Sequence, residues 1–243
     1  MNLKEYSAGL ILIFNIVCAQ TVFSQLKSVV ISPKIVTEPR KFDGVFENEK
    51  PLLVTYPIVK SKLNLPVKNK IESAIDYNSV FDNSLKAAIG GEVSTLEFHY
   101  EINYNKNYIL DIVFLRETLG AYPWTSRKEI VFDLRTGSKI KAKDLFKESS
   151  LPLLTGKVRR KWRDEIARTK RKYGAIPQEM ESAAYLTENL DDFTIGDKGV
   201  TFNYDYNFNF ASRALQPKGR FFFRYSELKS FIKPDSLLAK LIR

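Results

Sequence analysis

The residue types that usually perform catalysis are scarce in this sequence. His99 is the only histidine and Cys18 is the only cysteine. Protein zinc sites use several His or Cys ligands, and a serine or cysteine nucleophile is ordinarily activated by a neighbouring histidine. His99 also belongs to a segment of alternating apolar and polar residues, where its position groups it with the polar side chains. We therefore predict a solvent-facing His99, no metal site, no cofactor and no catalytic site built on a nucleophile and a histidine.

Carboxylates are the remaining candidates for chemistry. Asp191, Asp192 and Asp197 could bind Ca²⁺, but their spacing lacks the EF-hand pattern of ligands around a glycine. Roles in turns and caps explain these residues more simply. Two carboxylates could also act on a sugar, provided that the fold sets the separation that such chemistry needs. We predict a non-catalytic protein and keep a carboxylate-dependent glycan hydrolase as the third-ranked alternative.

An aromatic pair beside an arginine forms the first candidate binding site. Tyr122, Trp124 and Arg127 lie in a segment that begins with a turn-forming Tyr-Pro pair, so we expect a loop. Trp, Tyr and Arg dominate the energy of many protein interfaces, and they also suit stacking on a sugar ring. The alternative is that Trp124 only covers the edge of a sheet. The second candidate is Arg213, where an aromatic-rich stretch from residue 207 runs into a small-residue loop.

Residues 157–173 form a strongly basic segment, with nine basic and two acidic side chains in a chain whose net charge is +10. Leu154, Val158, Trp162 and Ile166 recur every four residues there, as on the buried face of an amphipathic helix. Two interpretations of the opposite face stay open, namely a surface that binds anions and a solvated surface that keeps the protein soluble. The side chains assigned to this basic face are Arg159, Arg160, Arg163 and Arg171.

The first 24 residues are typical of a signal peptide. Lys4 precedes an apolar run over residues 10–17, and small residues then lead to an expected cleavage between Ser24 and Gln25. A lipoprotein signal would need small residues before Cys18, and those present do not fit. The run is also shorter than the roughly 20 residues that span a bilayer. We therefore predict an exported protein, periplasmic or extracellular, without a transmembrane anchor after cleavage.

Export has consequences for stability and for partners. Cleavage would remove Cys18, so the mature chain would be held by its core alone, without disulfides. A basic protein outside the cytoplasm meets anionic glycans, lipid phosphates or acidic proteins. We predict an anionic cell-wall or envelope polymer, or an envelope protein, as the partner, and no nucleic acid.

The order of apolar patterns predicts an α+β fold with a largely antiparallel sheet, helices packed on one face, and two similar-sized halves. Residues 25–44 are expected to be a linker or a peripheral strand. The expected strands are 52–59, 96–104, 108–115, 129–134, 193–195, 200–210 and 220–224. The expected helices run from Pro66 towards Gly90-Gly91, start at Asp144, cover the basic segment, start near Ser226 as N-cap, and close the chain over 235–242.

Three stretches of this sequence resemble the RsiV-like family of exported bacterial domains. Residues 54–75, VTYPIVKSKLNLPVKNKIESAI, resemble the start of its deacetylase-associated (PdaC-type) half. Residues 107–146, with Tyr122-Pro123, FDLRTG and DLF, resemble the end of that half. Residues 193–232, with the closing YSEL, resemble the RsiV-like C-terminal half. The resemblance implies a deacetylase-associated half over 45–143 and a C-terminal half over 144–243.

The resemblance also implies a role at the cell envelope. Members of the family occur beside peptidoglycan-deacetylase domains, as sensory ectodomains and as secreted proteins, and some bind lysozyme. The family loop commonly carries a histidine where this chain has Tyr122, so a role that depends on an imidazole there is not expected. We predict an envelope binding protein for an anionic wall glycan or an envelope protein. The second interpretation is a secreted sensor or inhibitor of a protein such as lysozyme, for which acidic side chains near Trp124 would be informative because common lysozymes are basic.

Overall fold

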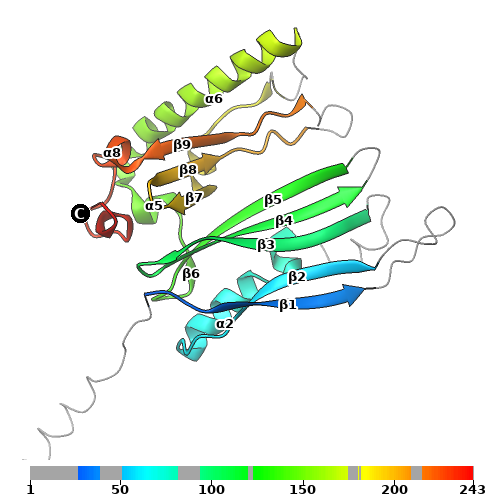
Figure 1. The fold of residues 1–243 in the computed structure, drawn as a ribbon. Coiled ribbons are helices and arrows are strands. Elements are labelled where there is room, and N and C mark those ends of the chain that lie inside the picture. The colour runs from blue at the N-terminus through cyan, green and yellow to red at the C-terminus, as the bar shows by residue number, and fades with distance from the viewer. Residues whose placement is uncertain are drawn as a thin grey trace, which may run out of the picture.

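The computed structural model shows an α+β fold built on two sheets (Figure 1), which confirms the predicted class and the largely antiparallel pairing. The predicted signal peptide, the helix end at Gly90-Gly91, Tyr122 and Arg213 lie outside the described part. The structure describes residues 27–38, 51–81, 94–119, 123–174, 180, 182–208 and 215–242.

The larger sheet has six strands in the order β1-β2-β3-β4-β5-β6. Neighbouring strands are antiparallel except β2 and β3, which are parallel. A parallel pair needs a crossover connection, and this one contains α2 (Leu65–Ala74) and α3 (Tyr77–Phe81). β1 is the edge strand, as the peripheral-strand interpretation predicts. The strands are β1 (Ile31–Glu38), β2 (Leu52–Val59), β3 (Ser94–Lys106), β4 (Ile109–Leu119), β5 (Pro123–Asp133) and β6 (Ser138–Lys139).

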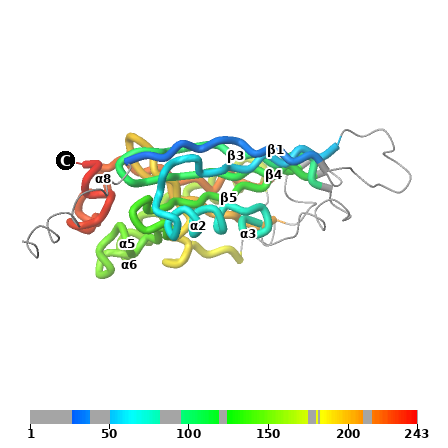
Figure 2. Tube along the Cα trace, turned by 90° about the horizontal axis from the view of Figure 1, so that it is seen from below, coloured from blue at the N-terminus to red at the C-terminus, as the bar shows by residue number. Residues whose placement is uncertain are grey.

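α2 packs against this sheet (Figure 2). Its start is fixed by Asn64, whose side chain accepts a hydrogen bond from the Val67 backbone N–H at 3.4 Å. Pro66 occupies the first turn, where a backbone N–H would have no carbonyl partner within the helix, so its absence costs no hydrogen bond. Val67 and Ile71 are buried with Phe98 of the sheet, as the sequence periodicity predicts.

The single helix predicted from Pro66 towards Gly90 is wrong, because the described part contains two helices. α2 ends at Ala74, and Ile75 closes it by donating its N–H to the Ile71 carbonyl at 3.0 Å. Asp76 then accepts a hydrogen bond from the Asn78 N–H at 3.0 Å. Such a local side-chain bond competes with the helix and begins a new one.

The β3–β4 hairpin departs from the regular alternation predicted for this segment. Its turn residues Asn107 and Tyr108 both have positive φ, 54° and 67°, as two-residue hairpins require. A register shift lies between Ile102 and Tyr104. Tyr104 is therefore buried, whereas Ile102, which the sequence pattern placed on the same apolar face, is exposed.

The smaller sheet has the order β7-β8-β9 and lies between α6 and the larger sheet (Figure 1). The predicted apolar stripe of the basic helix is confirmed, because Leu154, Val158 and Trp162 are buried in one cluster with Phe202, and Ile166 is half-buried against it. The elements are α6 (Leu151–Tyr173), β7 (Phe193–Gly196), β8 (Gly199–Asn203) and β9 (Arg220–Arg224).

The strand predicted over 200–210 is shorter than expected. β8 ends at Asn203, and one further hydrogen bond in the same register, from the Tyr204 N–H to the Gly219 carbonyl at 2.8 Å, lies beyond it. Tyr206 and Phe208 are nevertheless buried in the same cluster as Phe202. The prediction of a common core is correct, and the prediction of a continuous strand is wrong.

The connection between the sheets begins at a turn that needs glycine. Gly137 has φ +71°, and a Cβ there would lie 2.6 Å from the Val67 carbonyl oxygen. α5 (Ala142–Leu145) follows, and it starts before Asp144, contrary to the prediction. Asp144 instead accepts a hydrogen bond from the Lys141 N–H at 2.8 Å inside the first turn. The predicted boundary between the halves, after residue 143, falls within α5.

The C-terminal segment contains two further corrections. Arg224, and not Ser226, precedes α8 (Tyr225–Leu228), and its N–H donates to Glu227 Oε2 at 2.8 Å. The helix predicted over 235–242 is only a 3₁₀ turn, η5 (Leu238–Lys240). Ser236 lies before this turn, and its Oγ accepts a hydrogen bond from the Ala239 N–H at 3.3 Å. Two other 3₁₀ turns are η2 (Glu148–Ser150) and η3 (Thr187–Asp191).

No helix in the described ranges has the length and apolar character to cross a membrane.

Candidate functional site

Within the described part of the chain, the first part of β5 pairs with β4 on one side and with no strand on the other. β6 pairs only with Phe132 and Asp133. A cleft of about 270 Å³ borders β5 near Trp124, and a second cleft of about 320 Å³ borders it near Val131. Both clefts are lined by Glu129 and Asp192, so they lie next to each other along β5, and together they are called the β5 groove below.

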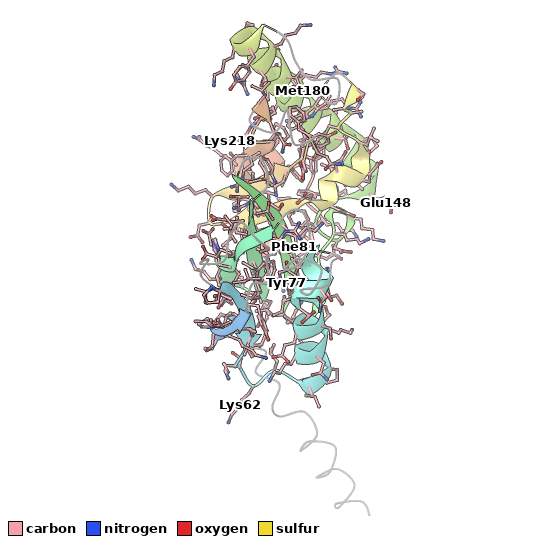
Figure 3. All side chains as sticks on the ribbon, turned by 90° about the vertical axis from the view of Figure 1, so that its right-hand side faces the viewer. Lys62, Tyr77, Phe81, Glu148, Met180 and Lys218 are labelled. Carbon is pink, nitrogen blue, oxygen red and sulfur yellow. The ribbon has the colours of Figure 1, made fainter. Side chains whose placement is uncertain are left out.

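The second sheet supplies the other wall of the β5 groove. Asp192 precedes β7, Asn203 ends β8, and the segment from Gln216 to Arg220 leads into β9. Lys218 marks this wall in Figure 3, which views the molecule from the side where β4 ends and β5 begins. Lys139 and Lys141 line the far part. The groove therefore brings together residues far apart in sequence.

The predicted binding loop at Trp124 and Arg127 is a strand in the structure, which corrects that prediction. Trp124 pairs with Thr118 of β4, and Thr118 Oγ1 donates to the Trp124 carbonyl at 3.3 Å. Side chains alternate along a strand, so those of Trp124 and Arg127 project from opposite faces of β5. Both residues border the groove because it follows the strand edge.

An ion pair lies at the middle of the β5 groove. Arg127 Nε donates to Glu129 Oε1 at 2.5 Å, and the Glu129 side chain is only 4 % exposed. Burial raises the pKa of the Glu129 carboxyl, and the charge of Asp192 adds to that effect, whereas Arg127 opposes it. Burial and the nearby Arg127 lower the pKa of Arg220. The Glu129 carboxylate is thus held out of bulk water beside the partly exposed guanidinium of Arg127.

Asp192 and Asn203 form the part of the wall with the least complete hydrogen bonding. Burial raises the pKa of Asp192, while Lys128 lowers it. The Asn203 amide donates to Asp192 Oδ1 over a long 3.5 Å. Asn203 is 7 % exposed, and its Oδ1 has no hydrogen-bond partner among the described residues. A buried carbonyl without a donor is costly, and this oxygen is closed off from the groove surface.

Gly219 fixes the loop that carries Lys218 and Arg220. Its φ is +60°, and a Cβ there would lie 1.9 Å from the Tyr204 carbonyl oxygen, so no other residue fits without movement. The Gly219 N–H donates to Glu165 Oε2 of α6 at 3.2 Å. The helix therefore anchors one wall of the groove.

A side-chain bridge fixes β7 against the larger sheet. Asp111 of β4 accepts hydrogen bonds from the Ile195 N–H at 2.7 Å and from Asn103 Nδ2 at 2.9 Å. Asn103 also donates to the Ile195 carbonyl at 2.7 Å. The two side chains thus form hydrogen bonds with both the N–H and the carbonyl of Ile195 in β7. Asp111 is completely buried, and this burial raises its pKa to about 7 although both hydrogen bonds oppose the rise.

The predicted basic residues of α6 have different surroundings. Arg159 is half-buried, and its Nε donates to the Tyr185 carbonyl at 3.0 Å. Arg160, Arg163 and Arg171 are exposed on the outer face, away from the β5 groove. His99 is half-buried rather than fully solvent-facing, with Nδ1 3.6 Å from Glu97 Oε1. Within the described residues no group of His, Cys, Asp and Glu could hold a metal ion.

Sequence reasoning missed Glu129, Asn203 and Arg220 as parts of a common site. The alternating pattern marked them only as polar positions of separate strands. Asp111 had a recognisable signal, because it is a carboxylate inside the apolar run ILDIVFL. A charge in a buried strand needs partners from elsewhere in the fold.

This chain is similar to known proteins in its fold and not in its sequence. No protein-family model matches the sequence, and no curated protein matches it. A crystal structure of a DUF3298 family member from Bacteroides fragilis NCTC 9343 is similar with a TM-score of 0.59 and 11 % identity, over 89 % of this chain and 98 % of that chain. A DUF3298 family protein from Pseudomonas aeruginosa PAO1 has a TM-score of 0.54 and 13 % identity, over 86 % and 96 %. This chain therefore has a fold similar to those of two solved DUF3298 family proteins.

Proposed function

We propose that this protein is an exported, non-catalytic binding protein of the cell envelope that holds a linear wall glycan in the β5 groove. The observation that carries the proposal is the arrangement of two neighbouring clefts along β5, which share Glu129 and Asp192 as lining residues. A groove along a strand edge suits an extended chain better than a compact ligand. Its lining of charged and amide side chains suits hydroxyl, amide and carboxylate groups.

Each part of the groove has chemistry for a glycan that carries negative charge. Arg220 and Lys218 can bind anionic substituents. The carboxylate of Asp192 can accept hydrogen bonds from sugar hydroxyls. Trp124 lines the cleft near the start of β5, and we propose that its ring stacks on a sugar there.

Replacing Trp124 by alanine is expected to weaken binding of a soluble anionic wall glycan about tenfold, because truncation of an aromatic contact costs more than about 1 kcal/mol at a binding centre. The loss should persist at high salt, where screening removes the contribution of Arg220 and Lys218. Calorimetric titration at low and high ionic strength measures the contribution of Trp124 and that of the two cations separately.

Tyr173→Ala is the matched control, since Tyr173 is an exposed aromatic residue on α6, outside the groove. It should bind the glycan as the wild type does. Equal affinity of Trp124→Ala and wild type would place the site elsewhere. Release of reducing ends from the glycan by the wild-type protein would contradict the non-catalytic assignment and favour the carboxylate-dependent hydrolase.

Export predicts a mature chain that begins at Gln25, because the charged start, apolar run and small residues occur in the order of a signal peptide. N-terminal sequencing of the protein from its native source measures this directly. A chain that begins at Met1 or at a lipid-modified Cys18 would contradict the prediction.

A second candidate function is the sensing or inhibition of a basic protein such as lysozyme. Glu129, Asp192 and Asp205 line the same cleft as Trp124, and carboxylates there complement a basic surface. A pull-down of the mature protein against purified wall, outer-membrane and lysozyme fractions separates the candidates. Capture by lysozyme without capture by wall material would favour this function over glycan binding.

A further inference from the structure

The exposed cations of α6 form a ridge that is distinct from the β5 groove. α6 has 23 residues and runs along the outer border of the molecule (Figure 1). Its inward face is occupied by Leu154, Val158 and Trp162. The cations on the opposite side, called the α6 ridge, are Arg160, Arg163, Lys170 and Arg171, and all four are exposed.

The charges of α6 are sorted between its two faces. Glu165 is turned inward, where it accepts hydrogen bonds from the Tyr206 hydroxyl at 2.9 Å and from the Gly219 N–H. Lys161 also turns to the protein, because its Nζ donates to the Phe222 carbonyl at 2.5 Å. Asp164 is the one exposed carboxylate among the outer cations. The fold thus uses Glu165, Lys161 and Arg159 internally and leaves the cations of the α6 ridge outside.

Some cations elsewhere pair with carboxylates, whereas those of the α6 ridge do not within the described residues. Lys106 pairs with Asp197 at 3.0 Å, and Arg135 pairs with Asp133 at 2.6 Å. Within the described residues, no salt bridge joins an α6 ridge cation to a carboxylate. The ridge therefore keeps its full charge for a partner.

The geometry points to an anionic phospholipid surface as the partner of the α6 ridge, and we propose that the protein docks there. From Arg160 to Arg171 the cations extend over about 17 Å along the helix axis, and none of them lines either cleft of the β5 groove. A convex, outermost ridge can contact a flat surface along its length without ordering a flexible chain. Each basic side chain near an anionic membrane contributes to adsorption, and Arg is suited to phosphate groups.

The test is co-sedimentation of the mature protein with vesicles of phosphatidylcholine, alone or with about 30 % phosphatidylglycerol. Wild type should bind the anionic vesicles at low salt and be released near 0.5 M salt, as expected for screening over roughly 4 Å or less. The triple variant Arg160→Gln/Arg163→Gln/Arg171→Gln should bind about tenfold or more weakly. The triple variant Lys62→Gln/Lys198→Gln/Lys229→Gln changes the net charge equally with exposed residues elsewhere, and it should stay within about threefold of wild type.

Asp164→Lys provides a test in the opposite direction that does not depend on the stability of the triple variant. Adding a cation to the ridge should strengthen vesicle binding about threefold or more. Equal losses in the two triple variants would overturn the proposal in favour of net charge. Binding to soluble dextran sulfate without binding to vesicles would overturn it in favour of a polymer. Trp124→Ala should leave vesicle binding unchanged, so failure here is distinguishable from failure of glycan binding in the β5 groove.

Discussion

Replacing Phe202 by alanine is expected to lower the free energy of unfolding by about 3 to 5 kcal/mol. Phe202 is completely buried, and its ring centroid lies 5.9 Å from that of Phe223 and 6.0 Å from that of Phe146. These neighbours come from β9 and from the residue that follows α5. They cannot all close around the vacated volume, so a cavity adds to the lost hydrophobic transfer energy. Denaturant unfolding at equilibrium measures the loss.

Phe222 provides the matched control for that prediction. It lies on β9 with its side chain 43 % exposed, while its neighbour Phe223 is buried. Phe222→Ala should change the free energy of unfolding by less than about 1 kcal/mol, as expected for surface positions. A loss below about 1 kcal/mol for Phe202→Ala would show that Phe202 is not a core residue. Similar losses in both variants would show that burial does not separate the two positions.

The contact between α6 and the smaller sheet could be predicted because two periodicities agree. Leu154, Val158 and Trp162 repeat at helical spacing, and the aromatic residues after Gly199 repeat at strand spacing. Each pattern leaves one apolar face that has to be covered. The two faces meet in the structure, where the Trp162 and Tyr204 ring centroids are 6.0 Å apart.

Element ends could not be predicted where single side chains decide them. Asp76 restarts a helix, and Glu227 accepts from a backbone N–H one residue before α8 begins. The register shift between Ile102 and Tyr104 cannot be read from the hydrophobic pattern. It places one extra residue of β3 opposite β4, and the alternation of apolar and polar residues in the sequence does not mark that position. A pattern averaged over many residues does not resolve such local hydrogen bonds.

The β5 groove was only partly accessible to sequence reasoning. The sequence predicts Trp124 and Arg127 as binding residues in a loop, and the structure places them on a strand. Asp192 and Arg220 join them only after the smaller sheet has packed on the larger one. That packing depends on the bridge from Asp111 and Asn103 to Ile195, which joins residues more than 80 positions apart in the chain.

Asp111→Asn is expected to remove most of the loss of stability that the wild type shows between pH 5 and pH 8. The Asp111 pKa is about 7 in the folded protein, against an ordinary value of 3.8. The folded state therefore binds a proton that the unfolded state has released, so the wild type is most stable below pH 4 with respect to this group. That stability is lost as the pH rises through about 7. At about 1.4 kcal/mol per pKa unit, the loss between pH 5 and pH 8 is about 2 to 3 kcal/mol.

Asparagine at position 111 keeps an oxygen that can accept from the Ile195 N–H and from Asn103, but it does not ionise. Denaturant unfolding at pH 5 and pH 8 should therefore show a smaller difference for Asp111→Asn than for the wild type. A residual difference is expected from Glu129 and Asp192, because burial raises the pKa of both carboxyls. Asp197→Asn is the matched control, since this carboxylate is 69 % exposed and should keep the wild-type pH dependence. If Asp111→Asn and Asp197→Asn respond to pH alike, the buried bridge to β7 is not the group that titrates.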